Sequence, residues 1–263
     1  MKLEILLSCM HQKDTSLVQR SEISGDVLMI NQTDEDAQLQ ESLNGQRIRM
    51  ISTVERGLSR SRNMAIRNSD ADICLLCDDD EVLQPNYEEI ILRAFRELPR
   101  ADIIAFELGN KRTRLKSKVA RVQYLDSLKL CSCQLAFRRE RIIEKKLQFD
   151  PHMGSGSGNG CGEENKFLLD AMKAGLRVYY VPEQIAQLLP QESEWFFGFD
   201  EQFFYQRGGA TRYMLGLAPS ILYGMYYLVA KRGLYRKSIT MKTAACALAK
   251  GIKDNSIYHE KMV

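Results

Sequence analysis

The stretch Ala71-Asp72-Ile73-Cys74-Leu75-Leu76-Cys77-Asp78-Asp79-Asp80 joins a short apolar run to three consecutive carboxylates. The run from Ile73 to Cys77 has the length of a strand buried on both faces. Because side chains alternate along an extended chain, we expect Asp78 and Asp80 on one side and Asp79 on the other. Three adjacent anions repel one another, and Mg²⁺ or Mn²⁺, which prefer oxygen ligands, would relieve that repulsion. Taken alone, the triplet fits a solvated acidic turn equally well.

Strand-like and helix-like segments alternate at short intervals through the first 108 residues. The pattern predicts strands at 3–9, 27–30, 47–52, 73–77 and 102–108, and helices at 15–23, 58–67 and 85–98. Such alternation indicates an α/β fold with a doubly wound, mostly parallel sheet. Ligands bind these sheets beyond the carboxyl ends of the strands. Three predicted ends are polar or acidic, at 8–11, 31–36 and 78–80, and this favours the metal site over the acidic turn.

A glycine-rich stretch at 154–162 precedes a predicted helix at 163–174, and a strand is expected at 177–181. The stretch contains five glycines, so we expect it to order over a substrate. Glu163 and Glu164 stand at the start of the helix, where carboxylates interact favourably with the helix dipole. The functional alternative is a general base beside a mobile lid. Before this stretch, a strand is predicted at 131–137 and a short helix at 139–147.

The last part of the chain is aromatic and amphipathic. Seven aromatic residues fall between Trp195 and Tyr205, the stretch from Tyr213 to Ala230 carries no charge, and Lys and Arg recur from 236 to 253. The uncharged stretch is short for a membrane span of about 20 residues. We therefore predict amphipathic helices that pack partly on the domain and lie partly in a membrane interface. A plain surface helix explains the basic tail equally well.

Composition limits the class of protein. With 263 residues and 44% hydrophobic content, the chain can bury one sizeable core and carry an appendage. A net charge of +3 is too small to indicate a nucleic-acid binder. The first residues run into a strand pattern without the features of a signal peptide. The seven cysteines are odd in number and several lie in apolar runs, which favours reduced thiols and a cytoplasmic protein.

Three motifs follow one another in a fixed order. The stretch Arg56-Gly57-Leu58-Ser59-Arg60-Ser61-Arg62-Asn63 precedes the acidic strand end at 72–80. Gly162-Glu163-Glu164 opens the later helix, and the strand after that helix ends in Val181-Pro182-Glu183. These stretches resemble the "GLSxARN" helix, the "DxD" strand and the "GED" helix of family 2 glycosyltransferases with the GT-A fold, of the bacterial polysaccharide-biosynthesis type. The resemblance spans about residues 3–190.

The resemblance implies a domain plan and an activity. It implies a GT-A domain at 1–190, with a nucleotide-binding half at 1–108 and an acceptor half at 109–190, and a helical, membrane-associating extension at 191–263. The implied enzyme is inverting and moves one sugar from a nucleotide-diphosphate sugar, a UDP-sugar, to a glycan or lipid-linked glycan in surface polysaccharide synthesis. The "QxxRW" of processive synthases is absent. The implied location is peripheral, on the cytoplasmic face of the membrane.

The resemblance also implies roles for single residues. Asp80 is expected to bind Mn²⁺ or Mg²⁺, and Asp78 to contact the donor ribose or the waters of the metal. Glu164 corresponds to the general base, with Glu163 as its neighbour. Asn31 stands where many relatives have an aspartate that recognises uracil. The remaining residues expected around the donor nucleotide are Ser8, Cys9, Met10, Arg62 and Asp79.

One departure from the family pattern bears on the metal. Many relatives supply a histidine ligand after the strand that corresponds to 177–181, and this chain has none there. Gln191 or Glu192 are substitutes, or Asp80 and the diphosphate hold the metal alone. Two other functions stay open on the sequence: a nucleotidyltransferase acting on sugar phosphates, and a catalytically inactive GT-A scaffold at the membrane.

Overall fold

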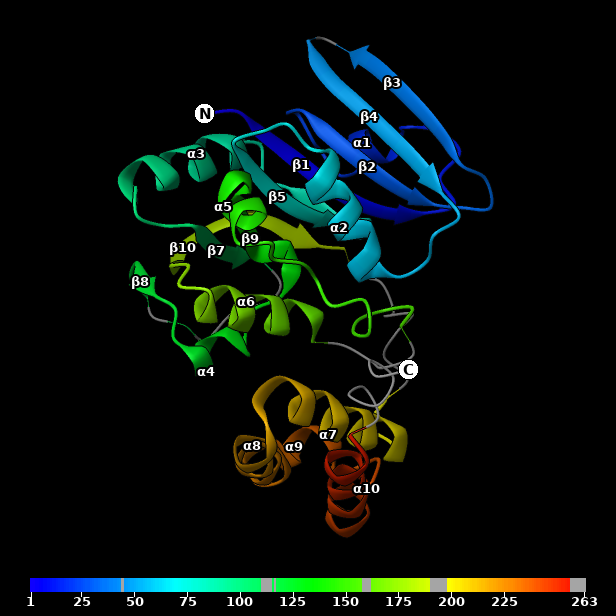
Figure 1. The fold of residues 1–263 in the computed structure, drawn as a ribbon, viewed down its shortest axis with the longest axis vertical. Helices are drawn as coiled ribbons and strands as arrows, with labels where there is room; N and C mark the ends of the chain where they lie inside the picture. Colours follow the sequence, from blue (N-terminus) through cyan, green and yellow to red (C-terminus); the bar gives the residue numbers. More distant parts are fainter. Residues whose placement is uncertain (44, 110–114, 116, 158–161, 190–197, 256–263) are drawn as a thin grey trace. The chain divides into compact units, whose positions relative to one another are not determined.

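The computed structural model describes the chain except residues 44, 110–114, 116, 158–161, 190–197 and 256–263 (Figure 1). The chain divides into two compact units, which we treat separately. The first comprises Met1–Phe149 and Glu164–Gln191, and the second Asp150–Glu163 and Glu192–Val263. All the strands belong to the first unit, whereas α7 to α10 belong to the second.

A ten-stranded sheet with the order β3-β4-β2-β1-β5-β9-β7-β10-β6 forms the first unit, and β8 pairs with β10. Strands β4, β2, β1 and β5 run parallel, as do β7 and β10, while β9 lies antiparallel between β5 and β7. The predicted α/β fold is thus confirmed. The bounds are β1 Leu3–Met10, β2 Val27–Gln32, β3 Ala37–Leu43, β4 Gln46–Thr53, β5 Ile73–Asp78, β6 Glu81–Leu83, β7 Ile103–Leu108, β8 Ala120–Arg121, β9 Leu135–Arg138 and β10 Val178–Leu188.

Helices cover both faces of this sheet. One hydrophobic cluster joins it to α1 and α3, and a second joins it to α2, α5 and α6. In β5, Ile73 and Leu75 belong to the first cluster, whereas Cys74 and Leu76 belong to the second. Asp78 therefore continues the α2 side of the sheet. The bounds are α1 Leu17–Arg20, α2 Leu58–Asn68, α3 Tyr87–Glu97, α4 Tyr124–Ser127, α5 Arg139–Glu144 and α6 Glu163–Lys173.

Three local predictions differ from the structure. The helix expected at 15–23 is the single turn α1, because the chain turns at Glu22 with a φ of 52°. The strand expected at 131–137 starts instead with a 3₁₀ turn, Ser132–Gln134, in which the side chain of Gln134 accepts from the backbone N–H of Cys131. Strand β3 was not expected: every residue of it is exposed, and the apolar alternation of Ala37, Leu39 and Leu43 is short and interrupted at Glu41.

The second unit contains the C-terminal helices α7 Glu201–Leu215, α8 Leu217–Ala230, α9 Arg232–Tyr235 and α10 Met241–Asp254. The carboxylate of Asp200 and the hydroxyl of Thr240 cap the starts of α7 and α10. Small residues bring these two helices together: a Cβ at Gly251 would overlap the carbonyl oxygen of Tyr205. None of the helices in the described ranges is long and apolar enough to cross a bilayer. The buried residues of this unit's core are Phe204, Tyr227, Tyr235, Ala244, Leu248 and Ile252.

We expect Gly251→Ala to destabilise the second unit by roughly 1–3 kcal/mol, because the methyl group overlaps backbone that cannot move independently. Gly233→Ala in α9 is the matched control, since nothing lies within 4 Å of a Cβ there. Thermal unfolding and limited proteolysis at the C-terminal helices measure the effect. Equal stabilities of the two variants would show that α7 and α10 do not pack this closely.

Candidate active site

The carboxyl ends of β2, β1 and β5 lie side by side. In the register of the sheet, Cys9 is opposite Asn31, and Ser8 is opposite Asp78. Asn31 in turn lies opposite Ser52 of β4. The predicted convergence of these polar strand ends on one edge is confirmed. The edge is also where an open α/β sheet binds its ligands.

The residues predicted at the nucleotide base differ in their surroundings. Asn31 is buried, and its amide group donates to the carbonyl oxygen of Gln12 at 2.8 Å and accepts from the N–H of Gln12 at 2.9 Å. Asn31 therefore holds the loop that follows β1. Burial raises the pKa of the Cys9 thiol to about 12. The hydroxyl of buried Ser8 lies 2.9 Å from that of Ser61 in α2, so of the three β1 residues only Met10 is exposed.

A buried arginine contacts the end of β5. The Arg62 side chain comes from α2 and is 1% exposed. Its Nη2 donates to both carboxylate oxygens of Asp78, each at 3.0 Å, and to the hydroxyl of Ser132 at 2.7 Å. Its guanidinium also lies over the ring of Phe149, 5.4 Å from the centroid. These contacts compensate for the loss of hydration that an arginine suffers on burial, and they fix the position of the Asp78 carboxylate.

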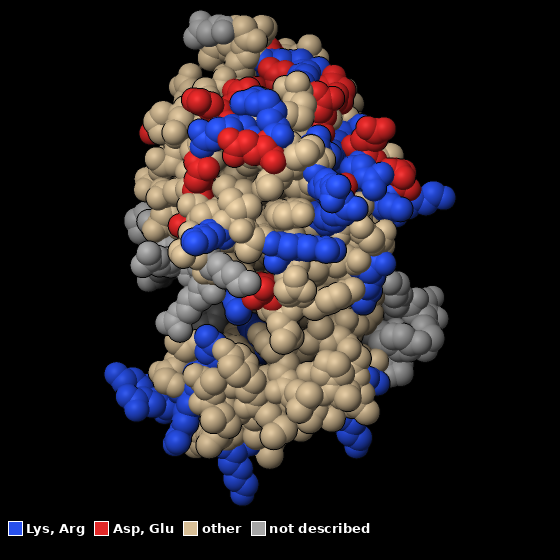
Figure 2. Space-filling model, turned by 90° about the vertical axis from the view of Figure 1, so that its left-hand side faces the viewer, with Lys and Arg blue, Asp and Glu red and all other residues tan. Residues whose placement is uncertain are grey.

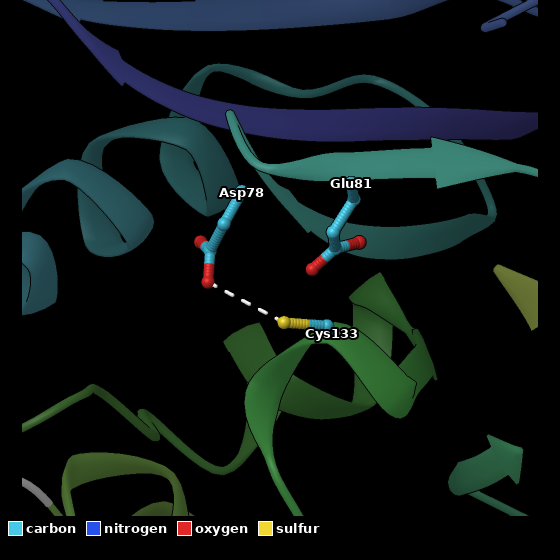
Figure 3. A group of neighbouring side chains, drawn as sticks. All are labelled: Asp78, Glu81 and Cys133. Atoms are coloured by element: carbon cyan, nitrogen blue, oxygen red, sulfur yellow. Dashed lines mark hydrogen bonds between the residues drawn. The ribbon is translucent and has the colours of Figure 1, made fainter. Parts of the chain in front are cut away.

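A second carboxylate, Glu81 of β6, faces the same spot (Figure 3). It is 0% exposed, and neither of its oxygens has a well-formed hydrogen bond within the part of the chain that the structure describes. Cys133 lies between the two acids and its thiol donates to Asp78 Oδ2 at 3.5 Å. Burial, and then the charge of Asp78, raise the pKa of Glu81 well above its usual range.

These three side chains form a candidate metal-binding group. One donor atom each from Asp78, Glu81 and Cys133 lies within 4.8 Å of the others. Two carboxylates and a thiol, with the buried Glu81 oxygens unsatisfied, fit a divalent cation. The group shares Asp78 with the predicted ligand pair. Asp80 lies outside it, in the turn before β6, where its carbonyl oxygen accepts from the N–H of Leu189 at 2.8 Å. Asp79 is exposed in the same turn, and Gln191 and Glu192 lie outside the described residues.

The sequence did not point to Glu81 or Cys133. Glu81 directly follows the acidic triplet, and this position was the one feature of the sequence that could have suggested a role for it in the site. Cys133 is 55 residues from Asp78 along the chain and reaches it because β9 pairs with β5. No local pattern predicts that pairing.

The two candidate bases differ in burial. Glu163 is 5% exposed, and its Oε2 accepts from the N–H of Gly162 at 3.1 Å. Gly154 lies against the same carboxylate: a Cβ there would be 2.9 Å from Cδ of Glu163, and its φ is +93°. Glu163 thus contacts both ends of the glycine-rich stretch, of which 158–161 lies outside the described residues. Glu164 is half-buried.

The resemblance to family 2 is confirmed by comparison with known sequences. Residues 31–156 match the family model described as glycosyl transferase family 2. The hyaluronan synthase of Streptococcus pyogenes is 25% identical over 167 residues, which is 55% of this chain and 40% of the synthase. The chain therefore spans less than half the length of such relatives.

Solved structures share the fold. TarS of S. aureus, residues 1–349 in complex with UDP-GlcNAc, has a TM-score of 0.62 and 12% identity over 90% of this chain and 74% of that one. The mannosyltransferase PcManGT of Pyrobaculum calidifontis, in complex with GDP-Man and Mn²⁺, has a TM-score of 0.56 and 12% identity over 96% and 75%. At these identities the likeness shows the GT-A fold alone.

We expect Glu81→Gln to stabilise the protein increasingly as the pH rises. Folding raises the pKa of Glu81, so this carboxyl ionises more readily in the unfolded chain than in the folded protein. The free energy of unfolding of the wild-type protein therefore falls as the pH rises above the ordinary glutamate pKa of about 4.3. Between pH 4 and pH 7.5 the difference in unfolding free energy should move steadily in favour of the variant.

Denaturant unfolding at a series of pH values measures this difference. Glu89→Gln, on an exposed position of α3, is the control and should show no such trend. A Glu81→Gln effect that is the same at every pH would mean that Glu81 does not ionise differently in the two states.

Proposed function

We propose that this chain, which contains a family 2 glycosyltransferase domain with the GT-A fold, transfers one sugar from a nucleotide-diphosphate sugar with inversion. The donor is a UDP-sugar, and the acceptor is a glycan or lipid-linked glycan of surface polysaccharide synthesis at the cytoplasmic face of the membrane. The observation that carries the proposal is Asp78, held by buried Arg62 at the ligand-binding edge of the sheet. The domain plan of 1–190 and 191–263 is part of the proposal.

The chemistry needs a neutralised diphosphate, because a nucleoside diphosphate leaves poorly while it keeps its full charge. Asp80 and Asp78 would hold Mn²⁺ or Mg²⁺, which would supply Lewis-acid stabilisation of that leaving group. Arg62 orients the Asp78 carboxylate for this task. The complexes of TarS with UDP-GlcNAc and of PcManGT with GDP-Man and Mn²⁺ support a donor and a metal of this kind. Asn31, Met10 and Asp79 are proposed to lie along the nucleotide.

Proton removal from the acceptor is assigned to Glu164. The carboxylate at the start of α6 is stabilised in its ionised form by the helix N-terminus. Glu163, with its side chain buried against Gly154 and Gly162, is assigned instead to holding the glycine-rich stretch. The proton leaves the acceptor hydroxyl as its oxygen attacks the anomeric carbon, and the nucleoside diphosphate departs in the same step.

Metal dependence is tested with Asp80→Ala. We expect turnover to be lost, while the free energy of unfolding changes by no more than about 0.5 kcal/mol, because Asp80 lies in a turn and not in the core. The assay measures nucleoside-diphosphate release from several UDP-sugars with Mn²⁺ or EDTA, and Glu89→Ala is the control. Equal wild-type rates in Mn²⁺ and EDTA would contradict the proposal. Release of diphosphate from UTP and a sugar 1-phosphate would identify a nucleotidyltransferase, and no release in either assay an inactive scaffold.

The general base is tested with Glu164→Gln, which keeps size and polarity but cannot accept a proton. We expect kcat to fall by roughly 10²–10⁴-fold while donor binding barely changes. Glu163→Gln is the matched comparison and should keep most of the turnover, since an amide oxygen can still accept from Gly162. The opposite result, an active Glu164→Gln and an inactive Glu163→Gln, would make Glu163 the base.

A further inference from the structure

The outer face of α8 is apolar and exposed. Its large side chains recur at helical spacing on one side, and among them Leu222 is 68% and Val229 is 71% exposed. The opposite side of α8 buries small residues: Ser220 is fully buried, and a Cβ at Gly224 would overlap the side chain of Leu248 in α10. Leu234 of α9 adds to the exposed surface. The α8 face consists of Leu217, Ile221, Leu222, Met225, Tyr226, Val229 and Leu234.

Basic residues predominate in the part of the chain that carries this face. From 202 to 253 the chain carries nine Lys and Arg and no Asp or Glu. Four of the nine follow α8 directly or flank α9, namely Lys231, Arg232, Arg236 and Lys237. In Figure 2 the helical unit is mostly neither acidic nor basic, with Lys and Arg side chains projecting from it and no acidic side chain on the side in view. A helix with one apolar face and basic neighbours has the character of an interfacial helix.

We propose that the α8 face docks on an anionic lipid bilayer, with its apolar side chains among the acyl chains and the four basic residues at the headgroups. An apolar face of this kind enters a bilayer by about 5–10 Å, and no described helix needs to cross it. A second copy of the chain fits less well, because pairing two such faces would bring two sets of basic residues together. Nucleic acid would match the charge and leave the apolar side chains uncovered.

This inference deepens the membrane location of the proposed function and gives it a named surface. The unit that carries the α8 face also contains the segment 150–163. Within that unit, the hydroxyl of Tyr213 in α7 donates to Asp150 at 2.6 Å, and a Cβ at Gly162 would lie 3.5 Å from Met214. A bilayer-bound α8 would therefore keep Asp150 and Gly162 in the unit that docks on lipid, where a lipid-linked acceptor is found.

Vesicle binding of the purified full chain tests the proposal. We expect the protein to co-sediment with vesicles of phosphatidylglycerol and phosphatidylcholine, and to bind phosphatidylcholine alone much more weakly. The double variant Leu222→Gln/Val229→Gln should lower the partition coefficient by at least roughly tenfold, because each lost side chain removes buried apolar area. Lys231→Gln/Lys237→Gln should lower it about fivefold per residue on anionic vesicles only.

The control is Leu125→Gln on α4, which replaces a leucine that is 74% exposed in the other unit and should leave binding unchanged. Nucleoside-diphosphate release from the donor with a soluble acceptor should be the same in all these variants. The vesicle experiment therefore tests the docking surface, and the release assay tests the proposed glycosyltransferase activity separately. Wild-type protein that does not bind anionic vesicles would overturn the inference. A dimer seen by light scattering that the Leu222→Gln/Val229→Gln variant dissociates would also overturn it. The same holds if Leu125→Gln loses as much vesicle binding as the double variant does.

Discussion

The ion pair between Arg62 and Asp78 is the constraint on which the proposed site depends. An arginine at 1% exposure needs an anion beside it, and removing one partner of such a pair costs about 3–5 kcal/mol. The pair joins α2 to the end of β5. The same nitrogen of Arg62 also donates to the hydroxyl of Ser132, which lies just before β9. Glu81 is buried beside this pair, and burial, followed by the charge of Asp78, raises its pKa well above the usual range.

The sequence predicted the secondary structure well where apolar residues recur over a short stretch. The apolar run of β5 predicted a strand buried on both faces, and the two clusters confirm it: alternate residues belong to opposite layers of helix. The same rule failed for the exposed edge strand β3, because its alternation of Ala37, Leu39 and Leu43 is weak and interrupted at Glu41. It also failed at Glu22, where a single residue in the left-handed region ended a helix that the apolar spacing favoured.

The candidate site was predictable only in part, for a similar reason. Polar strand ends can be identified one by one, and parallel order brings them together, as the pairings of Cys9 with Asn31 and of Ser8 with Asp78 show. The contacts of Glu81 and Cys133 depend instead on β9 running antiparallel between β5 and β7, which follows from tertiary packing. Adjacent residues such as Glu163 and Glu164 look alike in sequence. Their burial differs because the glycine-rich stretch packs on the first of them.

Helix α8 carries most of its large apolar side chains on its exposed side. In a helix of a soluble core, bulky apolar residues face inward. In α8 the inward side is made by Ser220, Gly224 and Tyr227, and α7 and α10 meet through Gly208 and Gly251. Small residues let helix backbones approach closely at these points, beside a core that includes Phe204 and Tyr235, and most of the large side chains of α8 lie on its outer surface. Because transferring apolar side chains from water to an apolar environment is favourable, this arrangement suits a surface that contacts hydrocarbon.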